Sequence, residues 1–135
     1  MKKIFALFVL VFGILFLLVK HGENMSMQSV STNSLVVFSQ TGCSHCRHAL
    51  AFIKKTIQPK YPKLDVQILD IKDRKNLLKL INVAKSHNLK EDDLMTPVIL
   101  LNGKIFVGWQ PEYESKLLSL IQSIFSKKDL TRAQK

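Results

Sequence analysis

Two cysteines three positions apart are the residues of this chain best suited to chemistry. Cys43 and Cys46 are the only cysteines among the 135 residues, and they fall between an apolar run at residues 35–38 and a helical pattern at residues 49–57. Positions i and i+3 share one face of a helix, so the two sulfurs can come within disulfide reach. The first sulfur would also lie over the free N–H groups of the helix start, which favour the thiolate that attacks disulfides. The spacing therefore predicts a dithiol redox centre.

Two other roles stay open for the cysteine pair. As a structural disulfide it would close a very short loop, which adds little chain-entropy stabilisation. As a zinc site it would need four ligands, and the chain has no second cysteine pair, so His45, His48 or a second chain would have to complete the site. We rank redox exchange first and a metal-binding or metal-delivery module second. The leading interpretation requires no cofactor and no metal.

The N-terminus has the pattern of a targeting segment. Lys2 and Lys3 precede an uncharged, strongly apolar run at residues 4–19. The run lies between the usual lengths of a signal-peptide core and a membrane-spanning helix. Residues 1–22 are therefore predicted to be a signal anchor or a cleaved signal peptide, and the polar residues 23–33 a linker. Because positive charges stay in the cytoplasm, either alternative exports the rest of the chain.

The strong basic balance does not indicate a nucleic-acid partner. The whole chain has a formal net charge of +10, but residues 31–126 carry 13 Lys and Arg against 8 Asp and Glu, a net charge of +5. These lysines are scattered over polar helix positions, and no nucleic-acid motif or aromatic platform accompanies them. We expect a solvated basic surface and no nucleic-acid binding.

Residues 34–126 are predicted to form one domain in the order β-α-β-α-β-β-α. Strands are expected at residues 35–38, 64–71, 95–101 and 104–107, the last two joined by an Asn-Gly hairpin turn. Helices are expected from the dithiol to just before Pro59, at residues 75–87 behind an Asp73 cap, and from Pro111 onward. Residues 127–135 are expected to be a basic, frayed tail.

The apolar positions of these elements predict the core. On the second strand, Leu64, Val66 and Ile68 alternate with polar residues and are expected to face inward. On the second helix, the inward stripe is expected to include Leu77 and Leu78.

This element order, with Cys-x-x-Cys opening the first helix and Thr96-Pro97 opening the third strand, resembles the thioredoxin fold, a mixed four-stranded sheet flanked by helices. The resemblance implies that Cys43 is the nucleophile that forms the mixed disulfide and Cys46 the buried resolving thiol. It also implies that Pro97 is a cis-proline packed against the dithiol. The backbone of Thr96 would then pair with an extended substrate segment.

Other residues refine the resemblance. The small size is similar to glutaredoxins, and His45 before the second cysteine is similar to the Cys-Pro-His-Cys of bacterial periplasmic disulfide oxidases. The buried Asp that thioredoxins share is replaced by Val37. We expect His45 and Ser44 to tune the pKa of Cys43, and His48 to be a surface residue. Trp109 could contact a substrate or pack over the last helix.

These observations together predict an extracytoplasmic thiol–disulfide oxidoreductase of the bacterial periplasm, anchored in the inner membrane through residues 4–19 or secreted. Its partners would be protein thiols and disulfides and a membrane or periplasmic redox protein, and we expect a monomer. Whether it oxidises or reduces is left open by the sequence. The alternatives are the metal-binding module, with Cys43, Cys46 and a histidine, and a glutathione-dependent, glutaredoxin-like enzyme.

Overall fold

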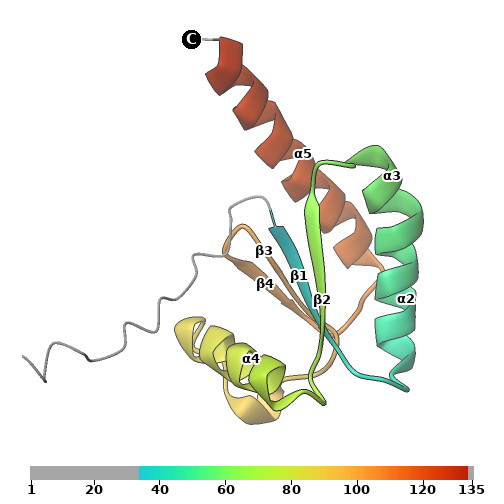
Figure 1. The fold of residues 1–135 in the computed structure, drawn as a ribbon, viewed down its shortest axis with the longest axis vertical. Helices are drawn as coiled ribbons and strands as arrows, with labels where there is room; N and C mark the ends of the chain where they lie inside the picture. The colour runs from blue at the N-terminus through green and yellow to red at the C-terminus, as the bar shows by residue number, and fades with distance from the viewer. Residues whose placement is uncertain (1–33, 134–135) are drawn as a thin grey trace, which may run out of the picture.

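A computed structural model describes residues 34–133, which fold around one four-stranded sheet (Figure 1). Its strand order is β2-β1-β3-β4. β1 pairs in parallel with β2 and antiparallel with β3, and β3 pairs antiparallel with β4. Both central strands are buried along their whole length, which is consistent with the apolar runs at residues 35–38 of β1 and throughout β3. The four strands are β1 (Ser34–Ser39), β2 (Asp65–Asp70), β3 (Val98–Leu101) and β4 (Lys104–Val107).

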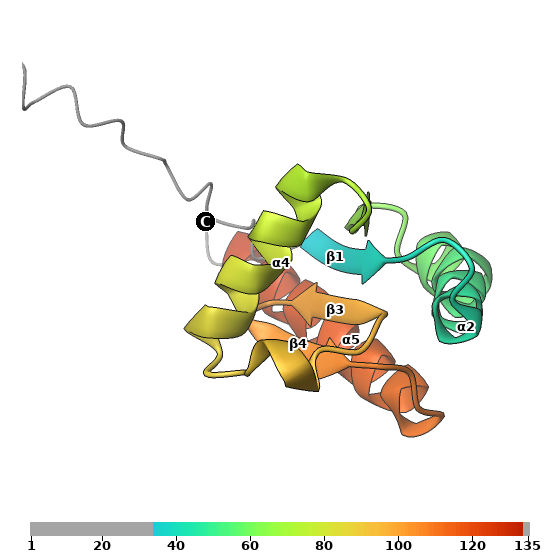
Figure 2. The ribbon, with the colours of Figure 1, turned by 90° about the horizontal axis from the view of Figure 1, so that it is seen from below.

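Helices cover both faces of this sheet. α2 and α5 lie on one face and α4 on the other (Figure 2). The parallel β1–α2–β2 unit followed by an antiparallel hairpin and a last helix is the topology of the thioredoxin fold, as predicted. The helical segments are α2 (Ser44–Phe52), the π-helix η1 (Ile53–Ile57), α3 (Gln58–Lys60), α4 (Arg74–Ser86), the 3-10 turn η2 (Glu91–Asp93) and α5 (Glu112–Ala133).

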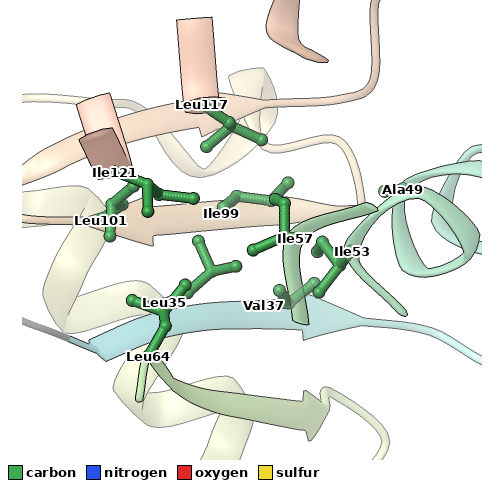
Figure 3. Close-up of a cluster of buried hydrophobic side chains, with 10 residues drawn as sticks. All are labelled: Leu35, Val37, Ala49, Ile53, Ile57, Leu64, Ile99, Leu101, Leu117 and Ile121. Atoms are coloured by element: carbon green, nitrogen blue, oxygen red, sulfur yellow. The ribbon is translucent and has the colours of Figure 1, made fainter. Parts of the chain in front are cut away.

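Two hydrophobic clusters hold these layers together. The larger lies between the sheet and the α2 and α5 helices (Figure 3), and the smaller lies between the sheet and α4. Because β1 and β3 contribute side chains to both clusters, they fix the position of every element around them. The larger cluster contains Leu35, Val37, Ala49, Ile53, Ile57, Leu64, Ile99, Leu101, Leu117 and Ile121; the smaller contains Val36, Phe38, Leu80, Val98 and Leu100.

Two local signals in the sequence are confirmed. The Asp73 side chain caps α4 by accepting a hydrogen bond of 2.8 Å from the Lys75 N–H. Asn102 and Gly103 have φ angles of 48° and 72°. Two consecutive residues with positive φ are typical of the two-residue turn that matches the twist of a β-hairpin.

The sequence predicted that the first helical run ends just before Pro59, and this prediction is wrong. The run continues through the π-helix η1 into α3, and Pro59 lies inside α3. In η1 the Gln58 N–H bonds the carbonyl of Ile53, five residues back. This wider turn relieves the conflict between a proline ring and the carbonyl four residues before it.

The prediction that Ile68, Leu77 and Leu78 face the core is wrong. Ile68 is 55% exposed, Leu77 39% and Leu78 52%. Ile68 lies on β2, an edge strand of the sheet. The buried residues of α4 are Leu80 and Ala84; Leu77 lies on their side but one turn nearer the start of the helix, and Leu78 lies to one side of it.

The C-terminal residues also differ from expectation. The backbone of α5 stays helical through Ala133, so most of the expected frayed tail continues the helix. Lys, Arg, Leu and Ala are good helix formers, which accounts for the extension. The predicted anchor and linker at residues 1–33 lie outside the described residues. Within residues 34–133, no helix combines the length and apolar character needed to cross a membrane.

Candidate active site at the Cys43–Cys46 disulfide

Cys43 and Cys46 form a disulfide at the start of α2. The loop from β1 reaches this position through Gly42, whose φ of 88° is unfavourable for residues with a side chain. The Cys43 N–H then donates to the Gln40 carbonyl at 3.2 Å, and the Cys43 carbonyl accepts from the Arg47 N–H at 3.2 Å. A tight turn therefore places Cys43 at the N-cap and the bridge over the first turn of the helix.

The two sulfurs have different surroundings. Cys46 is 2% exposed, whereas Cys43 is only partly buried. The Cys46 N–H donates a hydrogen bond of 3.1 Å to the Cys43 Sγ. A negative charge on that sulfur would be stabilised by this donor and by the positive end of the helix dipole. An attacking thiolate can therefore reach Cys43 more easily than Cys46.

The loop before β3 brings Thr96 and Pro97 to the same sulfur. Thr96 Oγ1 donates to the Cys43 Sγ at 3.5 Å, and the Thr96 carbonyl oxygen also lies 3.5 Å from it. The Thr96–Pro97 peptide bond is cis, as the resemblance implies, and Pro97 is buried. Thr96 thus contacts the Cys43 sulfur of the disulfide, although the two residues are 53 positions apart in the chain.

Gly108 holds this loop in place. Its N–H donates to the carbonyl of Met95 at 3.0 Å and to that of Pro97 at 2.8 Å. The φ of Gly108 is 74°, a conformation that favours glycine. Because the carbonyls on both sides of Thr96 are tied to Gly108, Thr96 is left facing the disulfide.

An open hollow of about 580 Å³ begins beside the disulfide and follows α2. His45 and His48 line it from the helix, and Trp109 lines it from the turn after β4. The Trp109 ring packs against Phe52 of α2, with centroids 5.7 Å apart, and against Tyr113 of the last helix, with centroids 6.5 Å apart. Contact of Trp109 with a substrate stays a prediction. Ser44, His45 and His48 are exposed. The tuning role of His45 and Ser44 stays a prediction.

A second hollow, of about 310 Å³, lies on the β2 side of the disulfide. Both cysteines line it, together with Ile68 and Asp70. The Asp70 carboxylate accepts hydrogen bonds from the Lys72 N–H at 2.9 Å and from Thr41 Oγ1 at 3.1 Å. The hydrogen bond from the Lys72 N–H is the main cause that lowers the pKa of Asp70; desolvation opposes it, and the Thr41 hydroxyl and the charge of Lys72 add to the lowering.

Sequence reasoning missed the contact between Thr41 and Asp70 in this second hollow. A signal was present, since β1 and β2 were predicted to be parallel and the carboxyl ends of parallel strands meet at one edge of a sheet. Asp70 ends β2, and Thr41 follows the end of β1. Their hydrogen bond therefore connects the end of β2 to the loop that carries Cys43.

The described residues offer no cluster suited to a metal. Within residues 34–133, no three His, Cys, Asp or Glu side chains come together in a way that could hold an ion. Both cysteine sulfurs are bonded to each other in this state. The metal-binding alternative therefore has no geometric observation in its favour.

Comparison with known proteins adds one structural likeness. A glutaredoxin from Archaeoglobus fulgidus is similar to this chain, with 22% sequence identity and a TM-score of 0.46 over 73% of this chain and 95% of the glutaredoxin. No protein-family model matches the sequence. No curated protein matches it either. The thioredoxin fold stands on the strand order and connections described above.

Proposed function

We propose that this protein is a thiol–disulfide oxidoreductase that acts outside the cytoplasm and exchanges the Cys43–Cys46 bridge with protein substrates. The observation that carries the proposal is the asymmetric disulfide at the start of α2. Cys43 is partly exposed and contacts Thr96, whereas Cys46 lies behind it at 2% exposure. This arrangement has one sulfur for attack and one for release.

In the oxidising direction, a substrate thiolate attacks the Cys43 Sγ and breaks the bond to Cys46. Cys46 leaves as a thiolate and takes up a proton, and a mixed disulfide joins Cys43 to the substrate. A second substrate thiol then attacks the substrate sulfur, forms the substrate disulfide and releases Cys43 as a thiolate. The Cys46 N–H and the Thr96 hydroxyl lie where they would stabilise that leaving thiolate.

The reducing direction runs through the same intermediate. The Cys43 thiolate attacks a substrate disulfide, and Cys46 then attacks Cys43 and releases the reduced substrate. Two electrons pass from the dithiol to the substrate, and the bridge forms again. The difference in reduction potential between this pair and its partners decides the direction.

Two exposed apolar side chains favour a protein as the substrate. Met95, directly before Thr96, is 66% exposed, and Ile68, in the hollow that both cysteines line, is 55% exposed. Apolar residues at a site rim are typical of contacts with another protein surface. The cis-proline loop adds a backbone strand edge at Thr96, which suits an extended peptide segment.

The test is to trap the intermediate with the full-length chain in detergent micelles. Cys46→Ser keeps the attacking sulfur and removes the resolving one, so its Cys43 thiolate should attack protein substrates that contain native or scrambled disulfides and accumulate as mixed disulfides with them. Cys43→Ser is the matched control and should accumulate far fewer. Equal trapping by both variants, or trapping by neither, would remove the proposal.

Reduction potential then separates the two directions. The wild-type chain is equilibrated in glutathione buffers, and its redox state is followed by alkylation. A value near about −120 mV indicates a disulfide donor, and one at or below about −230 mV a reductant. Turnover that strictly requires glutathione would favour the glutaredoxin-like alternative instead.

A further inference from the structure

α4 carries an exposed stripe that the dithiol chemistry does not use. Leu77 is 39% exposed and Leu78 is 52% exposed, and the partly buried Ile81 lies one turn further on. Arg74 and Lys85 stand at the two ends of these apolar residues. Positions spaced by three, four and seven share one side of a helix, so the five residues form one continuous stripe.

The charge of the helix is entirely positive. α4 contains four basic residues and no acidic one, and all four basic side chains are exposed. Arg74 and Lys85 belong to the stripe and Lys75 lies next to Leu78, and long basic side chains can lay their stems along an apolar surface while their charges stay outside it. The acidic residues that follow, in η2, come after a turn at Asn88, whose φ is 56°.

We infer that this stripe of α4 (Arg74, Leu77, Leu78, Ile81 and Lys85) rests on an anionic membrane surface. An exposed apolar strip flanked by Lys and Arg is the pattern of helices that lie in the lipid interface. The apolar side chains enter the boundary between headgroups and acyl chains, and the basic side chains meet the lipid phosphates. A second copy of the chain is a poorer occupant, because a symmetric contact would bring like charges together.

The place of α4 in the fold is compatible with the proposed redox function. α4 covers the face of the sheet opposite to α2 and α5 (Figure 2). The hollow between His45 and Trp109 lies on the α2 side, so contact through α4 leaves that side open. The contact is independent of the dithiol chemistry and depends only on the proposed extracytoplasmic, membrane-proximal location. An N-terminal anchor would raise the local concentration of α4 at the bilayer, so a weak contact suffices.

A depth-sensitive probe tests the contact in the full-length chain. Leu78→Cys, in a Cys43→Ser and Cys46→Ser background, is labelled with a fluorophore and reconstituted into nanodiscs that contain a quencher on the acyl chain. Thr56→Cys, at an exposed position on the other side of the sheet, is the matched site. With phosphatidylglycerol in the nanodisc, the Leu78 probe should be quenched several times more strongly than the Thr56 probe.

Charge reversal tests the electrostatic part. Arg74→Glu with Lys85→Glu, at the two ends of the stripe, should abolish the extra quenching at Leu78. In the wild-type sequence, this quenching should also fall when phosphatidylcholine replaces phosphatidylglycerol or when the salt concentration is raised. Lys54→Glu with Lys55→Glu makes the same charge change on exposed residues of η1 and should leave the quenching unchanged. Thermal melting of each variant verifies that it is folded.

Each outcome has a defined meaning. Equal quenching at the two sites, no dependence on lipid charge, or cross-linking of two chains through Leu78→Cys would overturn the inference. Flotation with vesicles reports membrane attachment separately: a chain that floats without quenching at Leu78 overturns the α4 contact alone, and one that does not float overturns the location as well. The trapping experiment with Cys46→Ser uses no lipid, so failure of the redox proposal is recognised independently.

Discussion

The difference between Cys43 and Cys46 originates in the first turn of one helix. Cys43 is the N-cap, so its sulfur lies over the helix start and accepts from the Cys46 N–H, while Cys46 is carried inward by the helical rotation. The same turn that buries one sulfur therefore presents the other. Thr96 adds a donor from a distant loop.

His45→Ala should make the dithiol more reducing. A positive charge or hydrogen-bond donor between the cysteines stabilises the Cys43 thiolate, so its removal destabilises the reduced form. We expect the reduction potential to become more negative by about 30 mV, which corresponds to a tenfold change in the equilibrium constant. His48→Ala is the control, since His48 is also exposed but lies outside the Cys-x-x-Cys segment. Equal shifts for both variants would contradict a specific role of His45.

Asp70→Asn should weaken the acid dependence of folding stability. The pKa of Asp70 is lowered in the folded state, mainly by the Lys72 N–H and then by Thr41. The carboxylate therefore contributes stability above its ordinary pKa of 3.8, and this contribution is lost as the pH falls through the lowered folded value. Urea titrations at a series of acidic pH values should show a smaller loss of stability for the variant. Asp92→Asn, on η2, is the matched control, and an identical slope for wild type and Asp70→Asn would contradict the prediction.

At the scale of elements, the central strands carry the stability and the edge strand borders the site. Ile99 on β3 is completely buried, whereas Ile68 on β2 is 55% exposed beside the disulfide. Ile99→Ala should lower the free energy of unfolding by about 2–5 kcal/mol, because it removes buried methyl groups and leaves a cavity. Ile68→Ala makes the same chemical change and should cost about 0.5 kcal/mol. Denaturant titration measures both, and a large loss for Ile68→Ala would show that the site rim is structural.

The sequence predicted the elements because their signals are local. The apolar run of β1, the Asp73 cap and the Asn102–Gly103 turn each depend on a few neighbouring residues, and together they are sufficient to define the order of the fold. The Cys-x-x-Cys segment and Thr96-Pro97 could likewise be recognised as site candidates from their position in that order. What these signals do not contain is the distance between separate loops.

The errors concern properties that depend on packing between elements. Ile68 and Leu78 have apolar side chains at suitable spacings, but whether another element covers them is decided by the position of helices far away in the chain. Pro59 would end an ordinary α-helix, and the π-helix before it removes the conflict. The Thr41–Asp70 hydrogen bond required the strand register, in which β1 and β2 end together.

At the scale of the whole molecule, the two proposals concern different surfaces of the described domain. The disulfide lies at the start of α2, with exposed apolar residues beside it, and the basic stripe of α4 lies on the opposite face of the sheet. A domain with this arrangement could remain at a membrane while its redox centre meets a protein partner. Both proposals place the domain outside the cytoplasm, so the compartment of the full chain is the property to measure at this scale.

The full-length chain expressed in a bacterium should place its dithiol outside the cytoplasmic membrane. After mild reduction, a membrane-impermeant maleimide should label Cys43 in intact spheroplasts, because the proposed topology keeps Lys2 and Lys3 inside and takes the rest of the chain across through residues 4–19. Lys2→Glu with Lys3→Glu should reduce the labelling by weakening this orientation signal. Lys54→Glu with Lys55→Glu changes the net charge equally within the domain and should leave it unchanged. Labelling that appears only after lysis would place the protein in the cytoplasm, where glutathione and thioredoxin keep thiols reduced and a disulfide donor would have no use.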